Sequence, residues 1–116
     1  MPLVKAEISV PCGKEKKLAL AKALSKLVSK GTGKPESYVA SVVEDDAAIT
    51  FAGEEKPGAF VEVRGIGGLS ASTNKKLSAD ICACLEEELG IPSTCVYINF
   101  TEIPATNWGW KGSTFG

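Results

Sequence analysis

The residue with the clearest potential for chemistry is Pro2, which directly follows Met1 in a chain of 116 residues that contains no histidine. Removal of Met1 would leave a secondary amine at the terminus. An α-amino group has an ordinary pKa of about 7.7–8.0, closer to neutral than any side chain here except a perturbed cysteine or lysine. Because no imidazole can serve as general base, the N-terminal proline is the leading candidate. The alternative is that Pro2 is only a small second residue that permits removal of Met1.

Lys34 is the cation best placed to act on such an amine. Abstracting a proton next to a carbonyl near pH 7 needs a base that is unprotonated and yet basic enough to accept it. Burial beside apolar groups and a nearby cation would both lower the pKa of the amine. Lys34 follows Gly33 at the expected end of a helix, so the alternative is a solvated lysine favoured by the helix dipole.

Two further segments place polar groups where they could meet a ligand. Gly65-Ile66-Gly67-Gly68 superficially suggests a dinucleotide loop, but Ser70 stands where the third glycine of G-x-G-x-x-G belongs, and no Gly-Lys-Ser/Thr is present. A phosphate site is therefore not favoured. Tyr97 and Asn99 are two apart on an expected strand and so share a face, where ordinary cross-strand pairing is the alternative to ligand binding.

The charge balance excludes some classes of partner. Thirteen Lys and Arg residues nearly match fourteen Asp and Glu residues, for a net charge of −1, so neither nucleic acid nor an anionic membrane is an expected partner. The longest apolar stretches are too short to span a bilayer. The first strand contains Lys5 and Glu7 and does not resemble a signal peptide. We therefore expect synthesis in the cytosol, and any export would be leaderless.

The cysteines do not suggest a metal or redox site. No pair has the Cys-x-x-Cys spacing, and no histidine is available to complete a mixed metal site. Cys82 and Cys84 are two apart on an expected helix, so they point to different faces and cannot easily form a disulfide. We expect reduced, mostly buried thiols that act as small hydrophobic groups, and neither a metal nor another cofactor. The remaining two of the four cysteines are Cys12 and Cys95.

Hydrophobic periodicity predicts alternating strands and helices. Strands are expected over residues 3–10, 38–43, 59–66 and 95–100, with a short extra strand over 48–51 and a turn over 53–58. One helix is expected over 14–30, and a second after an N-cap at Ser72, ending at Gly90. The predicted apolar stripes are Leu20, Leu24, Leu27 and Val28 on the first helix, and Leu77, Ile81, Cys84, Leu85 and Leu89 on the second.

An offset of 57 residues superimposes the two halves of the chain. The helical stripes match, and so does the sequence Gly-x-Pro-x-Ser/Thr-x-Val that begins at Gly33 and again at Gly90. This indicates a duplicated β-α-β unit. Right-handed crossovers would place both helices on one face of the sheet. The predicted fold class is α+β, a four-stranded mixed sheet with short extra strands. We expect a single domain over 1–116, with halves at about 2–45 and 59–101 and a C-terminal tail over 102–116.

The sheet face without helices is expected to meet another subunit. Neither side of the strand over 95–100 is strongly polar. A sheet covered by helices on one face should expose a polar second face to solvent. The tail carries Trp108, Trp110 and Phe115 on short segments with little core of their own. Aromatic residues in such a tail usually form an interface. Homo-oligomerisation is the simplest explanation.

Motifs along the whole chain resemble the macrophage migration inhibitory factor family of the tautomerase superfamily. They are Met1-Pro2, Thr32-Gly33-Lys34-Pro35, Phe51 with Gly53, Ile66-Gly67-Gly68, Val96-Tyr97-Ile98-Asn99-Phe100, Asn107-x-Gly109-Trp110 and Gly112-Ser113-Thr114-Phe115.

The resemblance implies a homotrimer of β-α-β-β-α-β subunits around a solvent channel, with pockets at the subunit interfaces. It implies an isomerase, of the intramolecular oxidoreductase class, that tautomerises aromatic 2-oxo acids such as phenylpyruvate and dopachrome-type substrates. Animal members are also leaderless secreted cytokines that bind a receptor of the invariant-chain type. The implied roles are general base for Pro2, binding of substrate oxygens for Lys34, Ile66 and Asn99, and an aromatic slot for Tyr97, Trp110, Phe115 and, at its rim, Tyr38.

One departure from the vertebrate pattern matters. A Cys-x-x-Cys pair is replaced here by Gly58 and Val61, so thiol-oxidoreductase activity is not expected. Two alternatives to a tautomerase remain open: a cytokine-like binding protein with a vestigial pocket, and a structural trimer without a relevant substrate.

Overall fold

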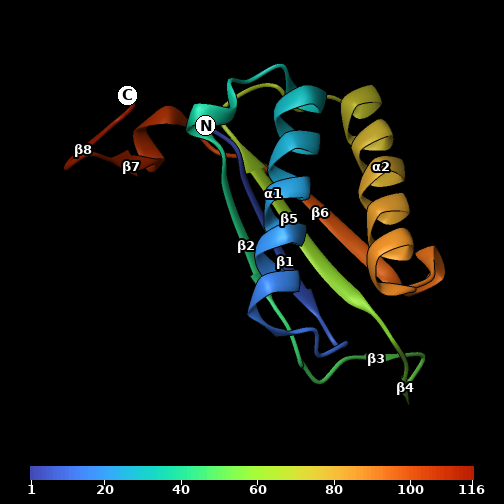
Figure 1. Ribbon diagram of the computed structural model, residues 1–116. Coiled ribbons are helices and arrows are strands. Elements are labelled where there is room, and N and C mark those ends of the chain that lie inside the picture. Colours follow the sequence, from blue (N-terminus) through green and yellow to red (C-terminus); the bar gives the residue numbers. More distant parts are fainter.

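The computed structural model describes all residues from Met1 to Gly116 and consists of two helices on one four-stranded sheet (Figure 1). The sheet has the order β2-β1-β5-β6. Strands β1 and β2 are parallel, β5 and β6 are parallel, and the central pair β1 and β5 is antiparallel. The predicted mixed sheet is therefore confirmed. Its main elements are β1 (Leu3–Ile8), α1 (Gly13–Thr32), β2 (Ala40–Glu44), β5 (Ala59–Gly65), α2 (Ala71–Leu89) and β6 (Val96–Glu102).

Short elements connect and extend these. Two small hairpins pair β3 with β4 and β7 with β8, and three single turns of 3₁₀ helix precede β2, β6 and β7. Their bounds are β3 (Thr50–Phe51), β4 (Glu54–Glu55), β7 (Gly109–Trp110), β8 (Ser113–Thr114), η1 (Glu36–Tyr38), η2 (Ser93–Cys95) and η3 (Ala105–Asn107).

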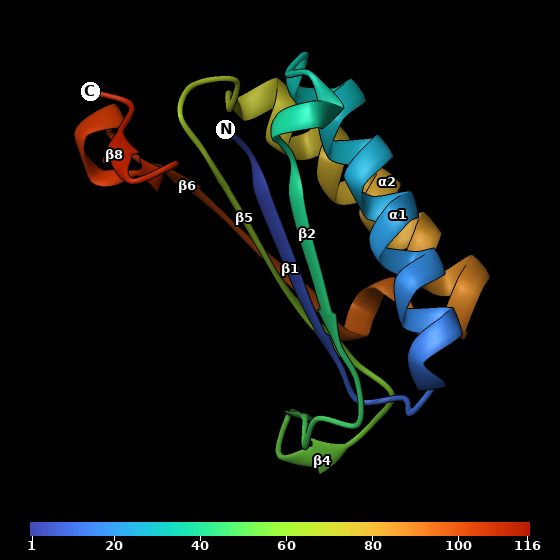
Figure 2. The ribbon, with the colours of Figure 1, turned by 60° about the vertical axis from the view of Figure 1, so that its left-hand side comes forward.

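Both helices cover the same face of the sheet, as predicted. Figure 2 shows α1 and α2 side by side on one face, while no element covers the middle of the other. The core between these layers is entirely apolar, because alternate residues of β1 and β5 meet one stripe of each helix. Its central residues are at most 1 % exposed: Val4, Ala6, Ile8, Leu20, Leu24, Val28, Ala59, Val61, Val63, Leu77, Ile81 and Leu85. The predicted Leu27, Cys84 and Leu89 are only partly buried, at the edge of this core.

Several predicted boundaries move because backbone groups find nearer partners. Tyr38 lies in η1, because its N–H donates to the Pro35 carbonyl (3.1 Å) and closes a turn before β2. Cys95 lies in η2 for the same reason, with the Pro92 carbonyl (2.9 Å) as acceptor. Strand β1 ends at Ile8 rather than at residue 10.

The N-cap of α2 is Ser70, so the prediction of Ser72 was wrong. The Ser70 hydroxyl oxygen accepts from the Thr73 N–H (3.2 Å), which is the usual reach of an N-cap side chain. The other ends of the helices agree with the sequence pattern. Gly33 and Gly90 end α1 and α2 in the left-handed conformation, with φ of 73° and 69°.

The thiols are less buried than expected. Only Cys95 is buried, while Cys12, Cys82 and Cys84 are half-buried, and all four are free. Partial burial raises the pKa of the Cys82 and Cys84 thiols, which keeps them in the less reactive protonated form. No group of three or more His, Cys, Asp or Glu side chains is arranged to hold a metal ion. Neither helix combines the length and apolar character needed to cross a membrane.

The uncovered sheet face is more polar than predicted. Its outer strand β6 exposes 69 % of Tyr97, but the central strands add charged side chains. Arg64 and Glu62 form an ion pair there (3.4 Å). The expectation of a mostly apolar face was therefore wrong for the middle of the sheet, because it rested on the strand over 95–100 alone.

The start of α1 is capped by a residue distant in sequence. Cys12 offers no side-chain cap. Instead, Asp45 Oδ2, just after β2, accepts from the N–H groups of Cys12 (2.9 Å) and Gly13 (3.3 Å), while Oδ1 lies 3.2 Å from the Lys17 ammonium. These hydrogen bonds, first that of Cys12 and then that of Lys17, lower the pKa of Asp45 from 3.8 to about 2. The contact ties the first β-α-β unit together.

We predict that Asp45→Ala lowers the thermal midpoint at pH 7, because two helix N–H groups lose their acceptor. A carboxylate with a depressed pKa stabilises the fold above its unfolded pKa and loses this effect as the pH falls through its folded pKa. The difference in thermal midpoint between wild type and variant should therefore shrink between pH of about 4 and about 2. Calorimetric scans across pH measure it, and an equal difference at pH 2 and pH 7 would contradict the assignment.

Candidate functional site

Pro2 is fully buried at the start of β1. Its carbonyl accepts from the Ala40 N–H at the start of β2 (3.1 Å), so the parallel pairing of these strands fixes the beginning of the chain. Met1 precedes it and carries the terminal amine. Partial burial, followed by the positive charge of Lys34, lowers the pKa of this amine below 8.0. The charge of Lys34 therefore acts on the terminal amine of Met1.

Lys34 is held by its backbone and presents a free ammonium. Its N–H donates to the Thr32 hydroxyl (3.3 Å), and its carbonyl accepts from the Ser29 hydroxyl (2.7 Å). The ammonium forms neither a hydrogen bond nor an ion pair with the chain. A half-buried cation without a partner is suited to binding an anionic ligand.

The loop after β5 lies against this lysine. Ile66 is half-buried, and the next two residues, Gly67 and Gly68, have φ of 71° and 80°. A Cβ atom on Gly68 would lie 3.1 Å from Lys34 Cε, and one on Gly67 would lie 3.6 Å from Lys34 Nζ. The glycines thus allow both a left-handed turn and the close approach of the loop to Lys34.

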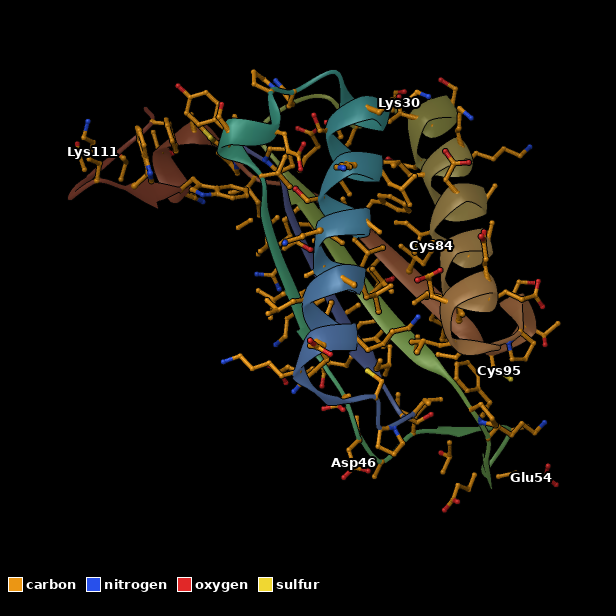
Figure 3. The ribbon with its side chains drawn as sticks, in the orientation of Figure 1. Lys30, Asp46, Glu54, Cys84, Cys95 and Lys111 are labelled. Carbon is orange, nitrogen blue, oxygen red and sulfur yellow. The ribbon has the colours of Figure 1, made fainter.

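Three predicted aromatic residues form one cluster at the same end of the sheet. The rings of Tyr38 and Trp110 meet edge to face at 5.9 Å, and those of Trp110 and Phe115 stack at 5.6 Å. Tyr38 is 44 % exposed and Trp110 is 52 % exposed, so the cluster has free aromatic surface. In Figure 1 the N-terminus, η1 and the β7–β8 hairpin lie together. Figure 3 shows Lys111 on this hairpin, far from the helices.

Tyr97 and Asn99 are not brought to Pro2 within the chain. In the register of the sheet, Asn99 is opposite Glu62, which is opposite Lys5. Tyr97 lies two residues further from the Pro2 end on β6, with its ring 5.2 Å from that of Phe51. Asn99 is level with Lys5, three residues from Pro2, which is about 10 Å along the strand direction at about 3.3 Å per residue. It also lies two strands away from β1, at about 4.8 Å per strand. The chain alone therefore assembles six of the eight predicted residues at one end and leaves these two on the uncovered face.

Two of the hollows on the surface of the chain bear on the choice of site. One of about 270 Å³ lies between Leu3 and the tail, and is lined by residues to which the sequence assigned no site role, including Arg64, Asn107 and Trp108. Arg64 could have been noticed as an outward-facing residue on β5. A larger hollow of about 500 Å³, lined by residues of the segments 9–11, 46–50 and 55–57, includes none of the predicted site residues. We assign the site by the chemistry at the N-terminus rather than by cavity size.

Local packing explains why Gly58 stands where the vertebrate pattern has a cysteine. A Cβ atom there would lie 2.7 Å from the ring of Phe51 and 3.1 Å from the Cys95 carbonyl oxygen. A cysteine at this position would displace the Phe51 ring, which lies against Tyr97. The absence of this thiol is thus coupled to the packing beside β6.

Known proteins share the sequence pattern and the fold of this chain. The chain matches the family described as macrophage migration inhibitory factor (MIF) over residues 1–116. A MIF homologue from Trichuris trichiura is 36 % identical over 115 residues, covering 99 % of this chain and all of the relative. The crystal structure of a MIF homologue from Prochlorococcus marinus is 38 % identical, with a TM-score of 0.93, and the match covers 98 % and 99 % of the two chains.

A more distant solved structure extends the comparison. It is a fused 4-OT protein described as a symmetric trimer, 27 % identical with a TM-score of 0.83 over 96 % of this chain and 93 % of the other. The full-length match to the family and the shared fold lead to one conclusion. This chain belongs to the macrophage migration inhibitory factor family and has the fold of the tautomerase superfamily.

Proposed function

We propose that the chain is a keto–enol tautomerase of aromatic 2-oxo acids such as phenylpyruvate, and of dopachrome-type substrates, with the Pro2 amine as general base after removal of Met1. The observation that carries this proposal is the free Lys34 ammonium beside the chain terminus: burial and then the charge of Lys34 lower the pKa of the Met1 amine, and the same surroundings would lower the pKa of the Pro2 amine once Met1 is removed. A lowered pKa leaves more of the amine unprotonated near neutral pH, as a general base requires. The isomerase class follows the tautomerase-superfamily fold.

The reaction needs only proton transfer. The Pro2 nitrogen accepts a proton from the carbon next to the substrate carbonyl, and the electrons of that C–H bond form the C=C bond. The carbonyl oxygen takes the displaced π electrons, and the Lys34 ammonium stabilises the negative charge that develops there. The protonated proline then gives its proton to this oxygen, which completes the enol. Substrate and product are isomers, so no cofactor or oxidant takes part.

The remaining proposed roles concern substrate binding. The Ile66 backbone would hydrogen-bond a substrate oxygen, and its side chain would form one wall. The aromatic ring of the substrate would enter a slot closed by Trp110 and Phe115, with Tyr38 at the rim. The exposed rings of this cluster support such a slot, because aromatic side chains gain by burying their faces against another ring.

We propose a homotrimer in which a neighbouring chain supplies Tyr97 and Asn99. Both residues are exposed on β6 and too far from Pro2 to serve it within one chain. The symmetric trimer of the related 4-OT protein supports this assembly. Asn99 would then bind the carbonyl or carboxylate of the substrate, and Tyr97 would line the aromatic slot.

Pro2→Gly tests the proposed base. With Met1 removed from both proteins, we expect the variant to enolise phenylpyruvate about a hundredfold more slowly, because a primary amine in a more flexible terminus replaces the fixed secondary amine. Enol formation is followed by ultraviolet absorbance, and light scattering should give three times the 12.1 kDa mass of the chain for both proteins.

The matched control for Pro2→Gly is the wild-type chain that retains Met1, as verified by mass spectrometry of the intact chain. Its Pro2 nitrogen is an amide without a basic lone pair, so it should be inactive although every side chain is present. Full activity of Pro2→Gly, or of the chain with Met1, would exclude Pro2 as the base.

Lys34→Met tests the electrostatic role of the lysine. Removing the positive charge should raise the pKa of the N-terminal amine, so the acid limb of the pH profile of kcat/KM moves to higher pH. Lys22→Met is the matched control, because Lys22 is exposed on α1 and forms no ion pair. Equal pH profiles for both variants and wild type would contradict the role of Lys34.

The names of the relatives, macrophage migration inhibitory factor and its homologues, favour a second candidate function, that of a cytokine-like protein. Its proposed partner is a receptor of the invariant-chain type. Under this alternative the pocket is vestigial, and the protein is made in the cytosol and exported by a leaderless route. Receptor binding measured with purified receptor ectodomain should then survive Pro2→Gly. A wild-type chain that binds the receptor without enolising phenylpyruvate would favour this second function.

A further inference from the structure

The last residue of β6, Glu102, binds the loop that follows β5. Its Oε2 accepts from the Gly67 N–H (3.1 Å) and its Oε1 from the Leu69 N–H (3.3 Å). Both oxygens of one carboxylate are therefore used on backbone donors that lie 35 and 33 residues earlier in the chain. Charge-assisted hydrogen bonds of this kind are stronger than those between neutral groups. The Glu102 side chain thus ties the loop to the end of the sheet, while Leu69 of the loop packs against the core.

This loop is also the surface against which Lys34 lies. Besides its contact with Lys34 Cε, a Cβ atom on Gly68 would lie only 3.2 Å from the Thr32 carbonyl oxygen. The loop therefore touches both the end of α1 and the stem of Lys34. A displacement of the loop would change the position of the Lys34 ammonium and of the Ile66 backbone together.

We propose that Glu102 is a positioning residue of the tautomerase site: it fixes the loop Ile66–Leu69 against Lys34 and thereby sets the distance between the two groups that bind the substrate oxygens. This inference rests on the proposed function. We assign Glu102 no contact with the substrate, because both of its oxygens accept from the Gly67 and Leu69 amides.

The internal repeat supports a distinction between structural and positioning roles. An offset of 57 residues places Asp45 on Glu102 and Cys12 on Leu69. In each half, a carboxylate at the end of the second strand accepts from the backbone just before the helix. Glu102 also accepts from the Gly67 N–H, and this second contact lies beside Lys34. Asp45 makes no contact beside Lys34 in the first half. Asp45 is therefore a counterpart with the same structural role and no site to position.

Glu102→Ala and Asp45→Ala form a matched pair of test variants. In Glu102→Ala we expect KM for phenylpyruvate to rise about tenfold and kcat to fall about tenfold as well, because the displaced Lys34 ammonium both contacts the bound substrate and stabilises the charge that develops in the transition state. Asp45→Ala should leave KM unchanged although it loses an equivalent structural contact. Glu102→Asp keeps both acceptor oxygens on a shorter side chain, so it should restore most of the wild-type KM.

A second measurement separates this proposal from the proposed function. The NMR signal of Lys34 Cε should shift in Glu102→Ala and not in Asp45→Ala, and the Gly67 and Leu69 amides should exchange faster with solvent. If the wild type does not enolise phenylpyruvate, the proposed function fails, and the Lys34 signal then decides whether Glu102 positions the lysine. An unchanged Lys34 signal, or equal KM values in Glu102→Ala and Asp45→Ala, would overturn the inference.

Discussion

The site depends on the antiparallel pairing of two parallel β-α-β units. Within each unit, a crossover helix buries its apolar stripe on the sheet and returns the second strand parallel to the first. Because β1 and β5 are antiparallel, the start of the first unit meets the end of the second. Pro2 at the start of β1, Lys34 after α1 and the loop after β5 therefore lie at one end of the sheet. The same constraint places the end of β6, and with it Glu102 and the aromatic tail, at that end (Figure 1).

This topology also explains why the chain by itself lacks part of the proposed site. Tyr97 lies near the start of β6 and Asn99 in its middle, away from the end where Pro2 is found, and both face outward from the uncovered side of the sheet. Moving them to Pro2 within the chain would require a slip of the β5–β6 register, which would expose the alternate residues that form the core. A neighbouring chain can supply them without any such change. The proposed trimer therefore completes the pocket and uses a face that the fold leaves open.

Much of the fold could be predicted from the sequence because it depends on periodicity. The stripes containing Leu24 and Ile81, the glycine ends of both helices and the repeat at an offset of 57 residues are local patterns, and together they indicated the sheet and the side on which the helices lie. The Asp45 and Glu102 contacts were missed because they join residues more than thirty positions apart, and only the strand register brings them together. The position of Ser70 as N-cap depends on the loop geometry set by Gly67 and Gly68.

The central claim is that one chain supplies the base and a neighbouring chain supplies Asn99 and Tyr97 to the same substrate site. The most direct test mixes Pro2→Gly chains with Asn99→Ala chains, each inactive alone, after joint unfolding and refolding. In randomly assembled trimers of an equal mixture, about one quarter of the sites would combine an intact Pro2 with an intact Asn99, so the mixture should regain about that fraction of wild-type activity. No recovery in mixtures shown by mass spectrometry to contain mixed trimers would contradict a site shared between chains.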